Sequence, residues 1–313
     1  MRDQYRKGLV SVIIPTYKRN QMITRAVMSV LNQTYSELEL LVVNDNEEGD
    51  SYSIELYKML GTIQDDRLHI VKQDKHINGA AARNAGIREA RGEYISFLDD
   101  DDFWDTKKLE YQVKELSLCD VSFGAVACLM RIYKSGRLVS ASMPYRDGYI
   151  LVDILDRKTS MGTGSLLIRR SALDETGYFD ESLLRHQDLQ LFARLTQKYK
   201  IKLQRIILHN REIGDSQNRP TIDSIETIKM KYFRSIKDIM DSLPQRKQRI
   251  IHVMHEFECA YLFLRNKKIK RGMGIIIRVV SMPETLYLAN HRIIKRMVSK
   301  LFRNTINHRY SRI

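Results

Sequence analysis

The chain has 313 residues, of which 43% are hydrophobic, and it carries a formal net charge of +14. This length suits one large domain with an appendage, and the mixed composition excludes a collagen-like or disordered protein. Three widely spaced cysteines, Cys119, Cys128 and Cys259, fit neither a disulfide framework nor a cysteine-based metal site, so we expect a reducing compartment.

Short apolar runs alternate with helical patterns along the first hundred residues. Leu9–Ile14 and Leu38–Val43 are β-branched runs of the kind that form strands buried on both faces. The predicted elements are, in chain order, a strand at 9–14 ended by Pro15, a helix at 22–31 capped by Asn20, a strand at 38–43, a helix at 53–60, a strand at 68–71, a helix at 79–90 and a strand at 94–98. This alternation predicts an α/β fold with a parallel sheet and right-handed crossovers.

The last of these strands runs directly into four carboxylates, Asp99, Asp100, Asp101 and Asp102, and then into two aromatic residues. Carboxylates this close repel one another, and a bound divalent cation would relieve that repulsion. Hard oxygen ligands suit Mg²⁺ or Mn²⁺, which in turn bridge to nucleotide phosphates. The alternative is a solvated acidic turn that caps the helix beginning near Lys107.

Ligands of open parallel sheets bind beyond the carboxyl ends of the strands. Three strand ends are polar here, at Pro15–Arg19, Asn44–Asn46 and Asp99–Asp102, and we expect them to converge on one crevice. No G-x-G-x-x-G or G-x-x-x-x-G-K-[ST] motif follows the first strand. The sequence therefore disfavours a dinucleotide-binding Rossmann enzyme and a P-loop phosphotransferase.

Six ordered motifs between Val10 and Leu208 resemble the family 2 glycosyltransferases, which have the glycosyltransferase-A fold. They are VSVIIPTYKR from Val10, SVLNQT from Ser29, LVVND from Leu41, NGAAARNAG from Asn78, ARGEYISFLDDDD from Ala90 and RHQDLQL from Arg185. The resemblance implies a Rossmann-like, mostly parallel sheet flanked by helices. It also implies inverting transfer from a nucleotide sugar, with a UDP-sugar expected as donor.

The resemblance assigns most of the nucleotide site. It implies that Asp45 accepts a hydrogen bond from uracil, that Asp101 ligates Mn²⁺ or Mg²⁺, and that Asp99 reaches the ribose or the metal. Other implied nucleotide-binding residues are Pro15, Thr16, Tyr17, Arg19, Arg83 and Asp100. The alternatives are structural, because Pro15 could simply end a strand, Tyr17 could pack and Arg83 could lie on a helix surface.

A second chemical centre is expected at Asp188, which precedes an amphipathic helical pattern. Inverting transfer needs one carboxylate to take the proton from the acceptor hydroxyl, and the family-like position implies that Asp188 is this base. The alternative is a carboxylate that interacts with the helix dipole. Trp104, Gly164 and Gln187 are expected to contact substrate, and Gln187 replaces a common acidic residue.

Further departures from the family pattern lie near the base site and downstream of it. Asn44 and Asn46 replace the more usual Asp and Gly on either side of Asp45. The loop after Arg211 lacks a histidine that is common in the family, although His209 lies nearby. A metal-ligand role and a structural role both remain open for His209.

We divide the chain into a catalytic domain at 1–220 and a basic helical region at 221–313. The second region holds 20 Lys and Arg against 7 Asp and Glu, whereas the first is nearly neutral. Amphipathic helices are predicted at 225–240, 249–264 and 293–302. Basic helices with apolar stripes suit an anionic membrane surface, and a solvated helical face is the alternative. No signal peptide or spanning helix of ~20 apolar residues is expected.

The sequence thus predicts a metal-dependent glycosyltransferase that extends a glycan or lipid-linked acceptor in cell-surface polysaccharide synthesis, such as capsule or lipopolysaccharide. We expect it in the cytoplasm, peripheral on the inner face of the membrane. A non-catalytic glycan- or partner-binding protein on the same fold is the alternative. A nucleotidyltransferase and a nucleic-acid-binding protein are further rivals, but no nucleic-acid recognition motif is apparent and no nucleic-acid partner is expected.

Overall fold

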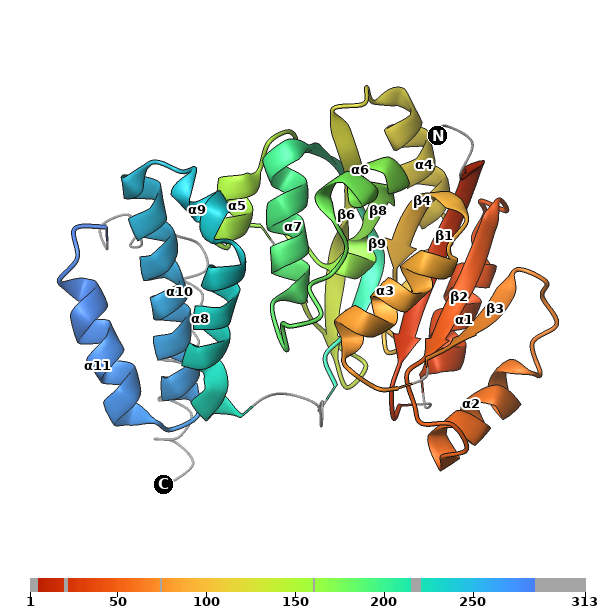
Figure 1. Cartoon of the computed structure of the whole chain (residues 1–313), viewed down its shortest axis with the longest axis horizontal. Coiled ribbons are helices and arrows are strands. Elements are labelled where there is room, and N and C mark those ends of the chain that lie inside the picture. Colours follow the sequence, from red (N-terminus) through yellow and green to blue (C-terminus); the bar gives the residue numbers. More distant parts are fainter. Residues whose placement is uncertain (1–4, 20–21, 74, 160, 215–220, 285–313) are drawn as a thin grey trace. The chain divides into compact units, whose positions relative to one another are not determined.

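The computed structural model describes residues 5–19, 22–73, 75–159, 161–214 and 221–284. The chain divides into two compact units (Figure 1). The first comprises residues 1–150 and 160–217, and the second comprises residues 151–159 and 218–313. The division near 217 lies close to the predicted boundary at 220. The sequence did not predict that the short segment 151–159 groups with the C-terminal helices.

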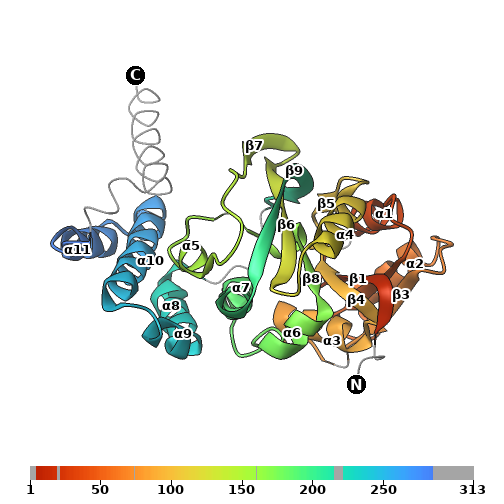
Figure 2. The same ribbon diagram turned by 90° about the horizontal axis from the view of Figure 1, so that it is seen from above.

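The first unit is built on one mixed sheet with the strand order β3-β2-β1-β4-β8-β6-β9-β5, and β7 pairs with β6 outside this path. The strands are β1 Arg6–Thr16, β2 Leu38–Asn44, β3 Leu68–Lys72, β4 Gly92–Phe97, β5 Phe103–Trp104, β6 Phe123–Lys134, β7 Arg137–Ala141, β8 Leu166–Arg169 and β9 Lys200–Glu212. β1 is parallel to β2 and β4, and β2 is parallel to β3, as predicted. Antiparallel β8 then joins this half to β6, which runs parallel to β9 (Figure 2).

The helices and short 3-10 turns of this unit connect the strands. They are α1 Ile23–Leu31, α2 Ser51–Leu60, α3 Gly79–Glu89, α4 Lys108–Leu118, η1 Thr163–Ser165, α6 Arg170–Thr176 and α7 Gln187–Lys198. Each predicted strand and helix of the first hundred residues is confirmed, with ends shifted by a few residues. Asn20, the predicted cap of the first helix, lies outside the described residues, and Met22 holds the N-cap position of α1.

Alternate residues of β1 face opposite sides of the sheet. Val10, Val12 and Ile14 join a buried apolar cluster that includes side chains of α1, α2 and α4. Ile13 faces α3, where a Cβ on Gly86 would lie 2.5 Å from Ile13 Cγ2. Only glycine allows α3 to lie this close to the sheet, and the small side chains of this Ala-rich helix suit that contact.

The second unit contains α5 Leu151–Leu155, η2 Ile222–Ser224, α8 Ile225–Ser235, α9 Lys237–Asp241, α10 Gln245–Arg265 and α11 Ile269–Val280. The predicted helix at 225–240 is divided between α8 and α9, and the one at 249–264 corresponds to α10. Helix α11 was not predicted from the sequence, and the helix predicted at 293–302 lies outside the described residues. None of the described helices meets the length and hydropathy that a membrane span requires.

A buried polar cluster links the helices of this second unit. Lys229 Nζ lies 2.6 Å from Glu258 Oε2 and 2.8 Å from His255 Nδ1, while His255 Nε2 lies 2.9 Å from the Leu155 carbonyl. Burial and the adjacent Lys229 lower the pKa of His255 well below its usual value. A neutral imidazole donates from Nε2 and accepts at Nδ1, which matches these contacts. The cluster therefore fixes segment 151–159 to α8 and α10.

Candidate active site

Thr16, the last residue of β1, joins two of the polar strand ends. Its carbonyl accepts a hydrogen bond of 3.0 Å from the Asp45 backbone, and its hydroxyl donates a 2.9 Å bond to Asp100 Oδ2. All three residues are at most 2% exposed. The strand register requires this meeting, because Thr16 lies opposite Asn44 while Ile13 lies opposite Phe97. Asp45 and the acidic run thus share one edge of the sheet, as the sequence predicted.

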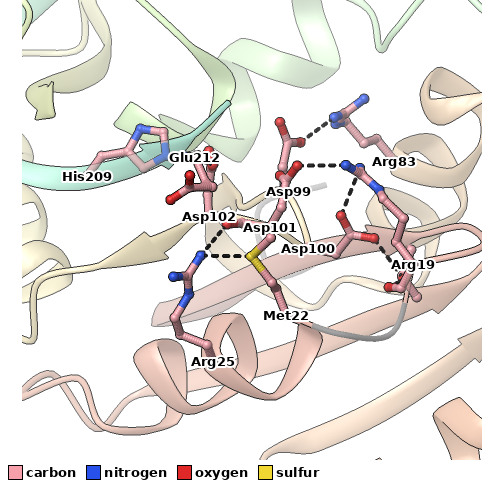
Figure 3. Close-up of polar contacts among 11 residues, drawn as sticks. Arg19, Met22, Arg25, Arg83, Asp99, Asp100, Asp101, Asp102, His209 and Glu212 are labelled. Carbon is pink, nitrogen blue, oxygen red and sulfur yellow. Dashed lines mark hydrogen bonds and ion pairs between the residues drawn. The ribbon is translucent and has the colours of Figure 1, made fainter. Parts of the chain in front are cut away.

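Arginines compensate the first three carboxylates of the acidic run (Figure 3). Arg83 Nη2, from α3, lies 2.6 Å from Asp99 Oδ1. Arg19 bridges the next two, with Nη2 2.9 Å from Asp100 Oδ1 and Nη1 2.6 Å from Asp101 Oδ2. Each arginine comes from a segment that the sequence motifs had singled out. The run is therefore a charge-compensated cluster in which Asp100 and Asp102 are buried, and it is not the solvated turn of the alternative.

Asp102 is held by the far half of the sheet. Its Oδ2 lies 2.8 Å from His209 Nε2, and its Oδ1 accepts a 2.8 Å hydrogen bond from the Glu212 backbone. Asp102 and His209 are each 2% exposed. Both carboxylate oxygens are thus engaged, and His209 orients Asp102 in the described structure. Figure 3 places this pair beside the other carboxylates of the run.

Burial and neighbouring charges both shift the pKa values of the carboxyl groups in this cluster. Burial raises the pKa of Asp100 to about 7 even though Arg19 opposes the shift. Burial also raises the pKa of Asp101. For Asp99, burial acts in the same direction, but the combined effects of Arg83, Arg211 and His209 outweigh it and lower the pKa. Burial and the neighbouring carboxylates therefore disfavour the charged forms of Asp100 and Asp101, and added positive charge would stabilise those forms.

Three of these carboxylates lie close enough to share a cation. Asp99, Asp101 and Asp102 each offer an oxygen, and these oxygens lie within 4.8 Å of one another. Asp99 and Asp101 each direct one oxygen at an arginine, which leaves the other carboxylate oxygen for a ligand. Hard carboxylate oxygens are the donors that Mg²⁺ and Mn²⁺ prefer. The donor set therefore fits such an ion, with Asp101 and Asp99 better suited than Asp102.

Asp45 is paired with a histidine that the sequence analysis did not consider. His76 Nδ1 lies 2.8 Å from Asp45 Oδ2. The His76 ring also stacks on Tyr17, with ring centroids 3.6 Å apart and planes 4° from parallel. Burial raises the pKa of Asp45 to about 6, against the opposing effect of His76. Since β3 is parallel to β2, the segment that follows its carboxyl end approaches the same edge of the sheet, and this could have indicated His76.

The two asparagines that depart from the family pattern organise the loops around Asp45. Asn46 Oδ1 accepts a 2.7 Å bond from the Lys18 backbone, and Asn46 Nδ2 donates a 2.9 Å bond to Asn44 Oδ1. Asn44 Nδ2 in turn lies 2.7 Å from Ser53 Oγ on α2. These bonds connect the loop after β1 to the loop after β2, so the asparagines fix the positions of Asp45 and Tyr17 relative to each other.

Asp188 lies in the first turn of α7, where its Oδ1 accepts a 2.8 Å bond from the Leu189 backbone. The preceding residue, Gln187, lies 3.4 Å from Asn78 Oδ1 at the N-cap of α3. From the next turn of α3, Arg83 reaches Asp99. A short series of contacts thus connects Gln187, at the beginning of α7, with the acidic run through α3.

Trp104 and Gly164 form part of the core beneath the acidic run. Trp104 is 3% exposed, its Nε1 donates a 2.9 Å bond to the Gly164 carbonyl, and Lys108 Nζ lies 3.7 Å from the ring centroid. A Cβ on Gly164 would lie 2.7 Å from the His209 ring. In this structure the indole is therefore a packing residue and does not present a face for a sugar to stack on.

The other predicted residues gather at the same sheet edge. Pro15 lies within β1 opposite Val43, and Tyr17 and Arg19 follow directly. Arg25, which no sequence motif indicated, donates a 2.6 Å hydrogen bond from Nη2 to the Asp101 carbonyl. Its position in the first turn of α1 gave no motif signal, because that contact depends on how the helix packs.

Comparison with known proteins identifies the family. The sequence profile described as Glycosyl transferase family 2 matches residues 11–177. The uncharacterised glycosyltransferase YwdF of Bacillus subtilis is 27% identical over 219 residues, which cover 67% of this chain and 77% of that protein. WfgD of Escherichia coli, described as a UDP-Glc:alpha-D-GlcNAc-diphosphoundecaprenol beta-1,3-glucosyltransferase, is 37% identical over 115 residues, which are 37% of this chain and less than half, 44%, of WfgD.

Solved structures confirm the fold. S. aureus TarS residues 1–349, in complex with UDP-GlcNAc, superpose with a TM-score of 0.59 at 16% identity, covering 82% of this chain and 73% of that one. The mannosyltransferase PcManGT from Pyrobaculum calidifontis, in complex with GDP-Man and Mn²⁺, gives a TM-score of 0.56 at 20% identity, covering 99% and 90%. The chain has the glycosyltransferase-A fold and belongs to glycosyl transferase family 2, the nucleotide-sugar glycosyltransferases whose motifs its sequence carries.

Proposed function

We propose that this protein transfers a sugar, with inversion, from a UDP-sugar to a lipid-linked glycan acceptor in surface-polysaccharide synthesis. The observation that carries the proposal is the meeting of Asp45 and the acidic run at Thr16. A nucleotide that spans this edge would place its base at Asp45 and its diphosphate at Asp99 and Asp101. WfgD, by its description, uses UDP-Glc and a diphosphoundecaprenol-linked acceptor, which supports this donor and acceptor class.

A divalent cation, Mn²⁺ or Mg²⁺, is part of this proposal. Asp101 would hold it together with Asp99, whose oxygens are close enough to share one ion. When bound, such an ion neutralises the charge that develops on the departing diphosphate. Arg19 and Arg83 already supply positive charge to the same carboxylates, so they would add to the positive field at the diphosphate.

Asp188 is the proposed general base. Its Oδ1 is engaged by the Leu189 backbone, which fixes the carboxylate and leaves the other oxygen for an acceptor hydroxyl. Removing that proton as the hydroxyl oxygen attacks the anomeric carbon is worth roughly 10²- to 10⁴-fold in rate. Gln187, bonded to the Leu183 carbonyl at 2.6 Å and close to Asn78, would hold the beginning of α7 against α3.

Binding and turnover of UDP-sugars by three variants test this assignment. Asp101→Ala should lose metal-dependent UDP binding, measured by calorimetry with Mn²⁺ and with EDTA. Asp188→Asn should bind UDP as the wild type does but transfer sugar at least about 100-fold more slowly. Asp66→Asn, which changes an exposed carboxylate between α2 and β3, is the matched control. UDP-sugar binding without turnover in the wild type would favour the non-catalytic alternative, and no binding of any nucleotide sugar would refute the proposal.

The same proposal includes a peripheral contact with an anionic membrane, where a lipid-linked acceptor lies. The side chains of α11 that face solvent include Ile269, Met273, Ile277 and Val280, which are 56%, 43%, 68% and 62% exposed. Their spacing places them on one stripe of the helix. Lys267 and Lys268 directly precede this helix, and Lys270 and Arg271 lie in its first turn. An exposed apolar stripe beside basic side chains has the chemistry of an interfacial helix.

Vesicle flotation tests the membrane contact. Wild-type protein should float with phosphatidylglycerol-containing vesicles at low salt and much less with neutral phosphatidylcholine vesicles. Ile277→Asp should reduce flotation, whereas Ile54→Asp, at an apolar position on α2 that is 60% exposed, should not. Equal flotation of both variants and the wild type would remove α11 from the membrane contact.

A further inference from the structure

His76 stacks on Tyr17 and contacts the Asp45 carboxylate, and these are the two interactions that a planar nucleobase would make with the same residues. Its ring lies nearly parallel to Tyr17 at a centroid distance of 3.6 Å, and its Nδ1 lies 2.8 Å from Asp45 Oδ2. Proteins hold nucleobases by two interactions, stacking on an aromatic side chain and hydrogen bonds to the base edge. The imidazole, a flat nitrogen heterocycle with a ring N–H, makes both at once.

The two partners of His76 are also the groups to which the base would bind. Asp45 is the expected acceptor for a uracil N–H, and Tyr17 is expected to line the same pocket. Asp45 is 2% exposed, and a carboxylate this deeply buried needs a hydrogen-bond partner to be stable. Burial already raises the pKa of Asp45 to about 6, which indicates how costly its charge is there. In this structure, His76 provides that partner.

The segment that carries His76 is lightly held. Lys75, His76 and Ile77 make no backbone hydrogen bond to another described residue. The His76 side chain is 33% exposed and Ile77 is 53% exposed. Segments with few backbone bonds and little burial move at small cost in free energy. The contacts that hold the ring in place are therefore mainly those with Tyr17 and Asp45.

We propose that His76 occupies the base position of the nucleotide pocket in the nucleotide-free protein, and that the base of the incoming nucleotide displaces it. This inference rests on the proposed function, because it takes the ligand to be a uridine nucleotide. His76 then competes with the nucleotide base for the same position. Between turnovers it stays hydrogen bonded to Asp45 and stacked on Tyr17, and this lowers the affinity of the protein for the donor nucleotide. A residue that instead forms a permanent wall of the pocket would increase affinity.

Binding of UDP and of uridine to His76→Ala separates these two roles. A competitor that fills the pocket about 90% of the time lowers apparent affinity by about tenfold. His76→Ala should therefore bind both probes about three- to tenfold more tightly than the wild type, in the presence of Mn²⁺. The same factor is expected for both, since uridine lacks the diphosphate and reports the base position alone. His69→Ala, on β3, should leave both affinities unchanged.

UDP binding by a second variant, His76→Gln, and the NMR signals of His76 test the inference further. If His76→Ala is poorly folded, His76→Gln keeps a donor for Asp45 but removes the stacked ring, and it too should bind UDP more tightly. In the wild type, the imidazole NMR signals assigned to His76 with these variants should shift on UDP addition as the hydrogen bond to Asp45 is lost. Weaker or unchanged UDP binding by the variants, or an unmoved His76 signal in UDP-bound protein, would overturn the inference and leave the proposed function standing. Absence of UDP binding in the wild type would instead refute the proposed function.

Discussion

Arg19 Nη1 lies 2.6 Å from Asp101 Oδ2, so the carboxylate expected to bind a metal ion is already paired with a cation of the chain itself. The Arg19 side chain is 46% exposed, whereas that of Asp101 is 17% exposed. Because the Arg19 guanidinium is about half exposed, it can move away from the ion pair into solvent more easily than the Asp101 carboxylate can. Metal binding to Asp101 and pairing with Arg19 are therefore expected to oppose each other.

Arg19→Ala should increase the affinity for Mn²⁺ in the absence of nucleotide, by about three- to tenfold, because the variant leaves Asp100 and Asp101 without their main positive partner. Calorimetric titration with Mn²⁺ measures this effect. Arg19→Lys keeps a positive charge and should resemble the wild type. Weaker Mn²⁺ binding by Arg19→Ala would mean that the arginine orients the carboxylates and does not compete for them.

The pH dependence of UDP binding should follow Asp45. Burial raises the pKa of this carboxyl to about 6, so the charged acceptor is lost as the pH falls through that value. The dissociation constant for UDP should therefore be nearly constant from pH 8 to 7 and should rise below about pH 6. Asp45→Asn, which does not titrate, should bind UDP more weakly at pH 8 and show a flatter profile. A wild-type profile that stays flat down to pH 5 would argue against a base contact at Asp45.

The same substitution should stabilise the fold. A carboxyl whose folded pKa is raised above its unfolded value destabilises the protein at neutral pH, where it must be charged inside the structure. Asp45→Asn is expected to increase the free energy of unfolding at pH 7.5 by on the order of 1 kcal/mol. Urea denaturation of the two proteins measures the difference. A less stable variant would show that the pair with His76 outweighs the burial of the charge.

Glu39 provides a contrasting buried carboxylate, far from any catalytic assignment. Its Oε1 accepts bonds from Ser11 Oγ at 2.6 Å and from the Arg91 backbone at 2.7 Å. Burial acts to raise the pKa of Glu39, but the bonds from Ser11 and Arg91 outweigh it and lower the pKa below 4.5. Its contribution to stability is therefore present above pH 4.5 and is lost as the pH falls through the lowered folded pKa.

Glu39→Gln should lower the free energy of unfolding at pH 7 by roughly 2 to 3 kcal/mol, because an amide N–H₂ would then face the donors of Ser11 or Arg91. Urea denaturation at pH 7 and at pH 3.5 should show a smaller difference at the lower pH. Glu37→Gln is the matched control, since Glu37 pairs with Arg6 at an exposed site and should contribute little. Equal losses from the two variants would contradict the assignment.

Gly164 and Gly162 offer a matched pair beneath the acidic run. A Cβ at Gly164 would lie 2.7 Å from His209 Nε2, the atom that contacts Asp102, whereas the nearest atom to a Cβ at Gly162 is Met130 Cε at 3.5 Å. Gly164→Ala should therefore destabilise the fold by about 1 to 3 kcal/mol and lower transfer activity, while Gly162→Ala should do neither. Thermal denaturation and the transfer assay measure the two effects. Normal stability of Gly164→Ala would show that His209 moves freely.

The sequence was most informative where strands are buried on both faces and end in polar residues. β1, β2 and β4 could be predicted from their apolar runs, and the rule on strand ends was enough to bring Asp45 and Asp101 together. The same rule indicates that the segment after β3, which carries His76, approaches this edge, but the contacts of His76 with Tyr17 and Asp45 depend on the path of a loop. Periodicity gives no information about such a path.

Other features that the sequence did not predict also depend on contacts between residues that are distant in the sequence. Trp104 follows a strand in a motif-rich segment, but its indole N–H is satisfied by the Gly164 carbonyl, which no local pattern reveals. The half of the sheet built from β6, β8 and β9 mixes parallel and antiparallel pairs, so hydrophobic runs alone do not set its order. Antiparallel β8, inserted between β4 and β6, is what converts the predicted parallel sheet into a mixed one.

Segment 151–159 limits how this enzyme can be recombined with its relatives. It lies in sequence within the stretch that forms the sheet, yet it groups with residues 218–313, and the Leu155 carbonyl is hydrogen bonded to His255. A chimera that exchanges only the chain after 217 would leave Leu155 and Arg157 facing foreign helices. The second unit therefore cannot be exchanged as one continuous stretch of chain. A chimera that takes its C-terminal helices from another protein should fold only if residues 151–159 come from that protein as well.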